Sequence, residues 1–127
     1  MNNPSHKNIP RKSPRAYEAY AVFFETLANQ NRLRIINSLR TGPKNVTQVI
    51  ETTGLEQTCV SHCLKRLENC GFVTVKRDGK FRVYTLNTRT IGPLMRLIDT
   101  HTQTYCIHLI GDAHEHHAHA AARKVKQ

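Results

Sequence analysis

The chain has 127 residues, 39% of them hydrophobic and none of them tryptophan, which suits one domain with a small core. Nineteen Lys and Arg against nine Asp and Glu give a net charge of +10, which favours nucleic acid, and after it an anionic membrane, as partner. No apolar run approaches the roughly 20 residues that span a bilayer, and no secretory signal is recognisable, so we expect a cytoplasmic protein. In such a protein the four cysteines are better interpreted as free thiols or metal ligands than as disulfides.

The N-terminal half is predicted to form a basic arm followed by short helices. Residues 1–14 are polar and proline-rich, and they form either a flexible arm that lies on DNA or a solubilising tail. Residues 15–28 and the stretch from the Asn29-Gln30-Asn31 break to Thr41 have apolar residues at helical spacing, which predicts two helices. Their apolar positions are Tyr17, Tyr20, Ala21, Phe24 and Leu27, then Leu33, Ile35, Ile36 and Leu39.

A short helix over Val46–Thr53 and the stretch Gly54–Gly71 together predict a helix-turn-helix, because a glycine separates two helical patterns. In the second helix Val60, Leu64 and Leu67 fall on one face, the stripe that packs into a core. The opposite face carries hydrogen-bonding and cationic side chains, the types that read base edges and hold phosphates. These candidate DNA-binding residues are Gln57, Thr58, Ser61, His62 and Lys65.

A basic β-hairpin is predicted downstream of this helix. Residues 72–77 and 80–86 are rich in β-branched and aromatic residues, and Asp78-Gly79 between them is a strong hairpin signal. Four cations lie at its tip, more than solubility requires, so we expect a wing that contacts phosphates: Lys76, Arg77, Lys80 and Arg82.

The last predicted helix covers Ile91–Ile110, and it places His101, Tyr105 and His108 on one face with Leu94 and Ile98. Residues 111–127 form a basic tail crowded with histidines, which bind Ni(II), Cu(II) or Zn(II) whether or not this has a function. Sequence does not separate storage, sensing and incidental chelation here.

Three segments resemble the ArsR/SmtB family of winged helix-turn-helix repressors. They are FFETLANQNRLRIINSL, GLEQTCVSHCLKRLENCGFV and KRDGKFRVYTL, in the family's order and spacing, over roughly residues 15–110. The resemblance implies a mainly α fold with a β-hairpin wing, a homodimer formed by the first and last helices, and a promoter repressed until an inducer binds. It also implies base reading by Gln57, Thr58, Ser61 and His62. Glu56 in place of serine and Cys63 in place of histidine depart from the family pattern.

The cysteines are the first candidate for an inducer site. Cys59 and Cys63 are four residues apart on a helix, so both thiolates could hold a soft ion such as Cd(II), Pb(II), Zn(II) or As(III). Cys70 lies roughly 10.5 Å farther along a straight helix, which makes it awkward for the same ion. A third ligand would come from Cys106 or a tail histidine. A cadmium- and lead-sensing branch of the family resembles this arrangement in part, since Cys70 matches one of its ligand positions and Cys59 and Cys63 do not. Alternatively, these cysteines are small half-buried hydrophobes.

The last helix is the second candidate. The resemblance implies a zinc or nickel site there, but Thr88, Thr90 and Thr104 occupy ligand positions and only His101 matches. Such a site is at best half present, and packing at an interface is the simpler interpretation of His101.

The sequence therefore predicts a DNA-binding repressor that a soft metal or metalloid ion releases from its operator. The candidate metal ligands are Cys59, Cys63, Cys106 and His101. The alternatives are a thiol-redox or persulfide switch on the same cysteines, and a constitutive DNA-binding protein whose tail buffers metal. No catalytic signature is present, so we do not expect an enzyme.

Overall fold

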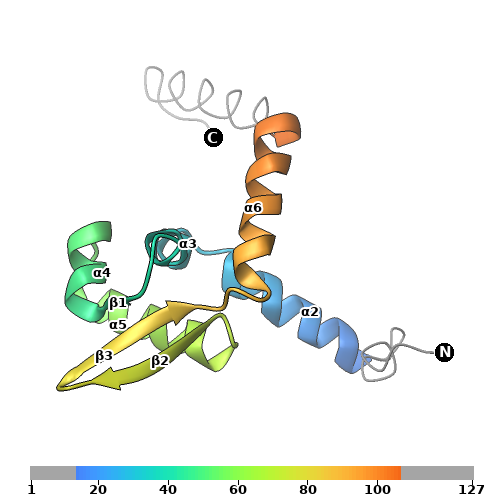
Figure 1. Cartoon of the computed structure of the whole chain (residues 1–127). Coiled ribbons are helices and arrows are strands. Elements are labelled where there is room, and N and C mark those ends of the chain that lie inside the picture. The colour runs from blue at the N-terminus through green and yellow to red at the C-terminus, as the bar shows by residue number, and fades with distance from the viewer. Residues whose placement is uncertain (1–13, 107–127) are drawn as a thin grey trace, which may run out of the picture. The chain divides into compact units, whose positions relative to one another are not determined.

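The computed structural model describes residues 14–106, and the chain divides into two units, residues 1–87 and 88–127 (Figure 1). In the first unit the elements are α2 (Pro14–Leu27), α3 (Gln30–Leu39), β1 (Lys44–Asn45), α4 (Val46–Thr53), α5 (Gln57–Asn69), β2 (Val73–Asp78) and β3 (Phe81–Leu86). The second unit carries α6 (Ile91–His101) and the π-helix η1 (Thr102–Cys106). The expected arm, apart from Pro14, and the expected histidine tail lie outside the described residues. Within residues 14–106, no helix is long and apolar enough to cross a membrane.

Side-chain caps set the boundaries of the helices that carry the site. The Asn29 side chain accepts a hydrogen bond from the Arg32 amide at 3.0 Å, so α3 begins at Gln30, within the predicted break. Asn45 and Gln48 form a reciprocal capping box at the start of α4, with bonds of 2.9 and 2.8 Å. Gly54 ends α4 with a φ of 76°, in the left-handed region that glycine adopts without strain.

The sheet has three antiparallel strands in the order β1-β3-β2. β1 was not predicted, because two residues are too few to show an alternating pattern. The hairpin differs from the prediction by one residue: β2 runs through Asp78 and β3 begins at Phe81, so Gly79 and Lys80 form the turn. Gly79 has a φ of 65°, which explains its place in the connection.

The core of the first unit lies where α3, α4 and α5 pack on one another and on the sheet. The predicted inward face of α5 is confirmed, since Val60, Leu64 and Leu67 are at most 1% exposed. Phe72 and Val73, where the chain leaves α5 for β2, are also buried. This packing buries one face of α5 and leaves the opposite face exposed.

α2 is apolar on a face that a single chain leaves exposed. Tyr17, Tyr20 and Phe24, members of its predicted apolar stripe, are 57%, 43% and 63% exposed. The neighbouring Phe23 packs on Phe72, with ring centroids 5.1 Å apart, and Leu27 is buried. Three exposed aromatic rings on one helix are more than a solvated surface requires, which indicates a surface that a partner covers.

In the second unit, α6 begins at Ile91 as predicted, but its α-helical geometry ends at His101. Thr102–Cys106 continue as a π-helix, and positions 107–110 of the predicted helix lie outside the described residues. Thr102 donates a side-chain hydrogen bond to the Asp99 carbonyl at 3.2 Å at this change of geometry. The ring of His101 lies 5.0 Å from that of Tyr105.

Candidate nucleic-acid interface and cysteine pair

The outward face of α5 carries all the DNA-binding residues that were predicted for this helix. All are exposed: Gln57, Thr58, Ser61, His62 and Lys65. Gln57 opens the helix, where the helix dipole is positive and favours an approaching phosphate. Glu56 precedes it without a side-chain capping bond, so the departure from serine costs the helix a cap but leaves its start in place. A rigid helix with a buried apolar face and an exposed polar face can enter a major groove.

The hairpin carries its cations in an arrangement that is unfavourable without an anion. The predicted wing residues Lys76, Arg77, Lys80 and Arg82 are all exposed. Arg77 and Arg82 are directly opposite each other in the β2–β3 register. Like charges facing each other across two strands destabilise a hairpin, and a phosphate between them would reverse the sign.

Replacing both arginines, Arg77→Gln with Arg82→Gln, should therefore have opposite effects on folding and on DNA binding. Removing the repulsion should raise the free energy of unfolding by about 0.2–1 kcal/mol. Removing two phosphate contacts should lower DNA affinity and reduce the slope of log K against log salt by about two. Urea unfolding and DNA titrations at several salt concentrations measure the two quantities. Loss of stability with an unchanged salt slope would mean that these arginines support the hairpin rather than bind phosphate.

Cys59 and Cys63 form a thiol pair on α5, beside the reading face. Cys63 is 8% exposed and Cys59 is half-buried, and their thiols lie within hydrogen-bonding reach of each other. Burial raises the pKa of the Cys63 thiol, and the neighbouring Cys59 raises it further through its charge and its hydrogen bond. The guanidinium of Arg32 opposes this shift by lowering the same pKa. The Cys63 thiol is therefore held protonated, with the Arg32 cation as an opposing influence.

Arg32 links α3 to α2, a role that the sequence did not indicate. Its side chain donates to the Thr26 and Glu25 carbonyls, at 2.7 and 2.9 Å, and so ties α3 to the C-terminus of α2. Cations there complement the helix dipole and satisfy terminal carbonyls. Arg66 of α5 donates to the Thr26 hydroxyl at 3.1 Å, so α2 and α5 share this anchor. The signal in the sequence is weak, because Arg32 and Cys63 meet only through tertiary packing.

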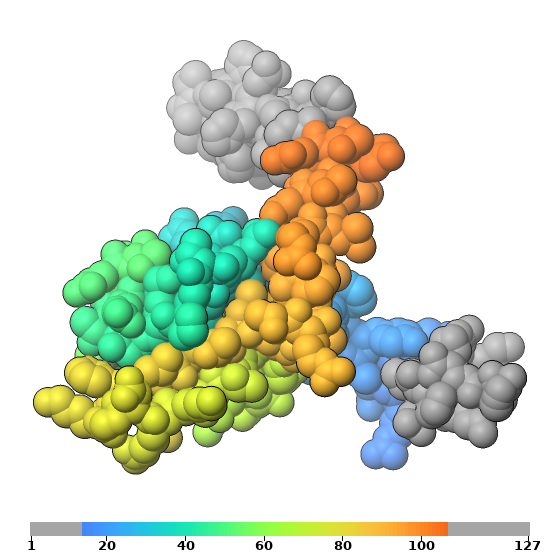
Figure 2. Space-filling view, in the orientation of Figure 1, coloured from blue at the N-terminus to red at the C-terminus, as the bar shows by residue number. Residues whose placement is uncertain are grey.

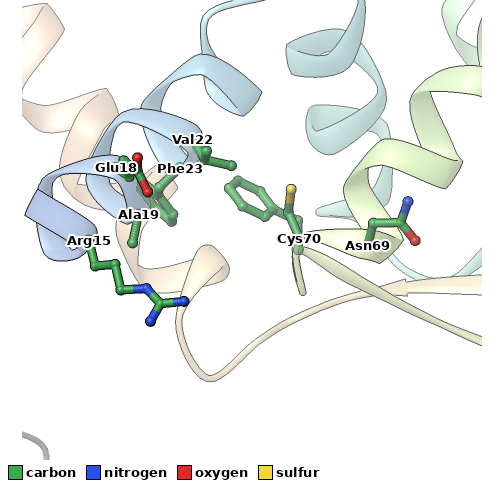
Figure 3. A pocket seen from close by; sticks show the side chains of 8 residues that line it. Arg15, Glu18, Ala19, Val22, Phe23, Asn69 and Cys70 are labelled. Atoms are coloured by element: carbon green, nitrogen blue, oxygen red, sulfur yellow. The ribbon is translucent and has the colours of Figure 1, made fainter. Parts of the chain in front are cut away.

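Cys70, the third cysteine of this region, has contacts of its own with α2. Its sulfur is 3.4 Å from the Thr26 hydroxyl, at the end of α5 nearest α2. It lines a pocket of about 510 Å³ whose other walls include Arg15, Glu18, Val22 and Phe72. Figure 3 shows the labelled α2 side chains on one side of this pocket, with Cys70 and Asn69 on the other. That Cys70 stands outside a Cys59–Cys63 site stays a prediction.

The complete predicted ligand set stays a prediction. Among the residues that the structure describes, no three His, Cys, Asp or Glu side chains are gathered so as to hold a metal ion. Cys59 and Cys63 belong to the first unit, whereas Cys106 ends η1 and His101 contacts Tyr105 in the second. His108 and the tail histidines lie outside residues 14–106.

Known proteins resemble the part of the chain that carries this site. The profile of a family described as "Bacterial regulatory protein, arsR family" matches residues 29–75, from the cap of α3 into β2. The regulator NmtR of Mycobacterium tuberculosis is 40% identical over 75 residues, covering 59% of this chain and 62% of NmtR. A solution structure of apo-NmtR aligns with a TM-score of 0.62 at 35% identity, over 72% of this chain and 77% of that one.

This chain belongs to the ArsR family. Another relative is the probable mercury resistance operon repressor of Streptomyces lividans, 32% identical over 77 residues, 61% of this chain and 62% of the repressor. Among solved structures, the homodimeric winged helix-turn-helix domain of Mb0332 from Mycobacterium bovis matches with a TM-score of 0.67 at 26% identity. That match covers 72% of this chain and 85% of the domain.

Membership in the ArsR family confirms the predicted winged helix-turn-helix, with α4 and α5 as its two helices and β2–β3 as its wing. It also agrees with the expectation of a regulator rather than an enzyme. The match to the two curated relatives spans 62% of the length of each, so their activities extend to this chain only as a proposal.

Proposed function

We propose that this chain is a homodimeric, sequence-specific DNA-binding repressor that a soft metal or metalloid ion releases from its operator. The observation that carries the DNA-binding part is the two-faced helix α5, whose apolar face is buried and whose polar face is entirely exposed. Exposed Gln, Thr, Ser and His on a helix anchored this way are suited to base edges. The cations of the wing supply the phosphate contacts that orient it.

Dimerisation is supported by the apolar surface of α2. Tyr17, Tyr20 and Phe24 are exposed in one chain, and burying such rings is strongly favourable. The related domain from Mycobacterium bovis is described as homodimeric. A two-fold dimer would present two copies of α5 to DNA, matching half-sites about one helical turn apart.

The inducer part of the proposal rests on Cys59 and Cys63. Two thiols on one helix turn suit a soft ion, and a relative is described as a probable mercury resistance repressor. Cd(II), Pb(II), Zn(II) and As(III) are candidates, and Ni(II) would point to histidine ligands. We propose Cys106 as the third ligand, from the same chain or from the second copy, with His101 as the alternative. An ion held there would sit against the helix that reads DNA, and would alter its placement.

The raised pKa of Cys63 favours an ion over an oxidant as inducer. Peroxides and persulfides react with thiolates, and burial keeps this thiol protonated. A metal ion supplies its own positive charge, which displaces the proton as the bond forms. The redox switch is therefore the second candidate.

The test of sequence reading is the variant Gln57→Ala on the duplex from the chain's own promoter region. Glutamine pairs with adenine through two hydrogen bonds, so the variant should lose about 1–3 kcal/mol of discrimination at one base pair. Affinity for a scrambled duplex of equal length should change little, because that affinity comes from phosphates. Thr47→Ala, an exposed polar residue on α4, is the matched control. Equal wild-type affinities for promoter and scrambled DNA would reject sequence-specific binding.

A further inference from the structure

An aromatic side chain stands among the cations of the wing. Phe81 is the first residue of β3, next to the turn, and 47% of its surface is exposed. Its cross-strand partner is Asp78, which is also exposed. The side chain that precedes it, Lys80, places its ammonium 5.8 Å from the centre of the Phe81 ring. Figure 2 shows the hairpin tip projecting from the helices of the first unit.

The fold does not need this ring for its own packing. Along β3 the side chains alternate, with Tyr84 and Leu86 buried against the core and Phe81 on the opposite face with Val83. β1 pairs with β3 only at Tyr84 and Val83, so Phe81 lies outside the part of β3 that β1 covers. A partner that covered this half-exposed phenyl ring would remove apolar surface from water, which is favourable.

The charge around Phe81 indicates what that partner is. Lys76 shares its face of the hairpin, Lys80 lies over its ring, and Arg77 and Arg82 occupy the other face. The hairpin tip thus carries four cations against one carboxylate, that of Asp78, which shares the face of the ring. This net positive charge suits a nucleic-acid groove, which offers phosphates on both sides and apolar sugars between them. Apolar side chains that enter a minor groove pack on sugars and base edges in this way.

We propose that Phe81 is an apolar DNA contact, which packs against the deoxyribose and base-edge surface of the minor groove while the wing cations hold the flanking phosphates. The inference rests on the proposed DNA-binding function and adds to it a residue that acts without charge. Lys80 completes the contact, because its ammonium lies over the ring and within reach of a phosphate.

The test is Phe81→Ala in the full-length chain, titrated with promoter duplex at several salt concentrations. Covering half of a phenyl ring predicts about a tenfold loss of affinity. The slope against log salt should stay unchanged, because no phosphate contact is removed. Lys80→Gln should instead reduce that slope by about one. Phe81→Leu should keep most of the affinity, and Thr74→Ala, exposed on the same face of the hairpin, should keep all of it.

Three results would overturn the inference while leaving DNA binding intact. One is wild-type affinity in Phe81→Ala. Another is that Phe81→Ala no longer lowers DNA affinity when Lys80→Gln is already present, which would mean that the ring only positions the lysine. The last is a change of oligomeric state in Phe81→Ala, measured by sedimentation, which would place the ring against a second copy. Wild-type protein that binds no DNA would instead reject the proposed function itself, and this contact with it.

Discussion

Replacing both cysteines of the pair, Cys59→Ala with Cys63→Ala, should weaken Cd(II) binding to the reduced protein by more than about 100-fold. Both sulfurs lie within reach of each other on α5, and among residues 14–106 no three His, Cys, Asp or Glu side chains are gathered that could hold the ion in their place. Alanine is the better replacement, because Cys63 is buried and a serine there would bury a hydroxyl. Competition with a chelator, followed by thiolate–metal absorbance, measures the affinity.

The control is Cys70→Ala, which should bind Cd(II) like the wild type, because Cys70 contacts Thr26 instead of the pair. Cys106→Ala and His101→Ala then identify the third ligand by the larger loss. For the wild type, affinity should rise with pH while pH is below the raised pKa of Cys63, since the ion must displace that proton. If the double variant bound Cd(II) as tightly as the wild type, the cysteine pair would not be the site, and the histidines would be the remaining candidate ligands.

Replacing Leu67 by alanine should lower the free energy of unfolding by about 2–5 kcal/mol. Leu67 is fully buried on the inner face of α5, and its loss leaves a cavity between this helix and its neighbours. Such a loss is a large part of the 5–15 kcal/mol that is typical of small domains. Urea unfolding followed by circular dichroism, at a fixed protein concentration, gives the difference.

Lys65→Ala on the outer face of the same helix separates folding from binding. Lys65 is exposed, so its removal should change stability by no more than about 0.5 kcal/mol while lowering DNA affinity. If Leu67→Ala were tolerated and Lys65→Ala unfolded the chain, the assignment of the two faces of α5 would be reversed.

Local sequence signals predicted most of the fold. Periodicity identified α2 to α5, and the faces of α5 were assigned correctly because Val60, Leu64 and Leu67 recur at three- and four-residue spacing. The hairpin followed from its β-branched residues and Gly79, with the turn displaced by one residue. β1 could not be found this way, since it exists only through its pairing with β3.

The tertiary contacts could not be predicted from the sequence. Nothing along the chain places Arg32 beside Cys63 or the Thr26 hydroxyl beside Arg66 and Cys70, because these residues meet only after the helices pack. Phe81 falls within the predicted strand of residues 80–86, but its exposure is known only once the structure shows which face of β3 packs on the core. The apolar stripe of α2 was visible in the sequence, but not that one chain leaves it exposed.

The most direct test of the account is the affinity of the reduced, metal-free full-length protein for its own promoter duplex, with and without one equivalent of Cd(II). We predict tight, sequence-specific binding without the ion and a loss of about 100-fold with it, a coupling of roughly 2.7 kcal/mol. The same ion should not release DNA from the Cys59→Ala/Cys63→Ala variant. Unchanged affinity with Cd(II) and with the other candidate ions would contradict the account, and would leave a redox-controlled or constitutive DNA-binding protein.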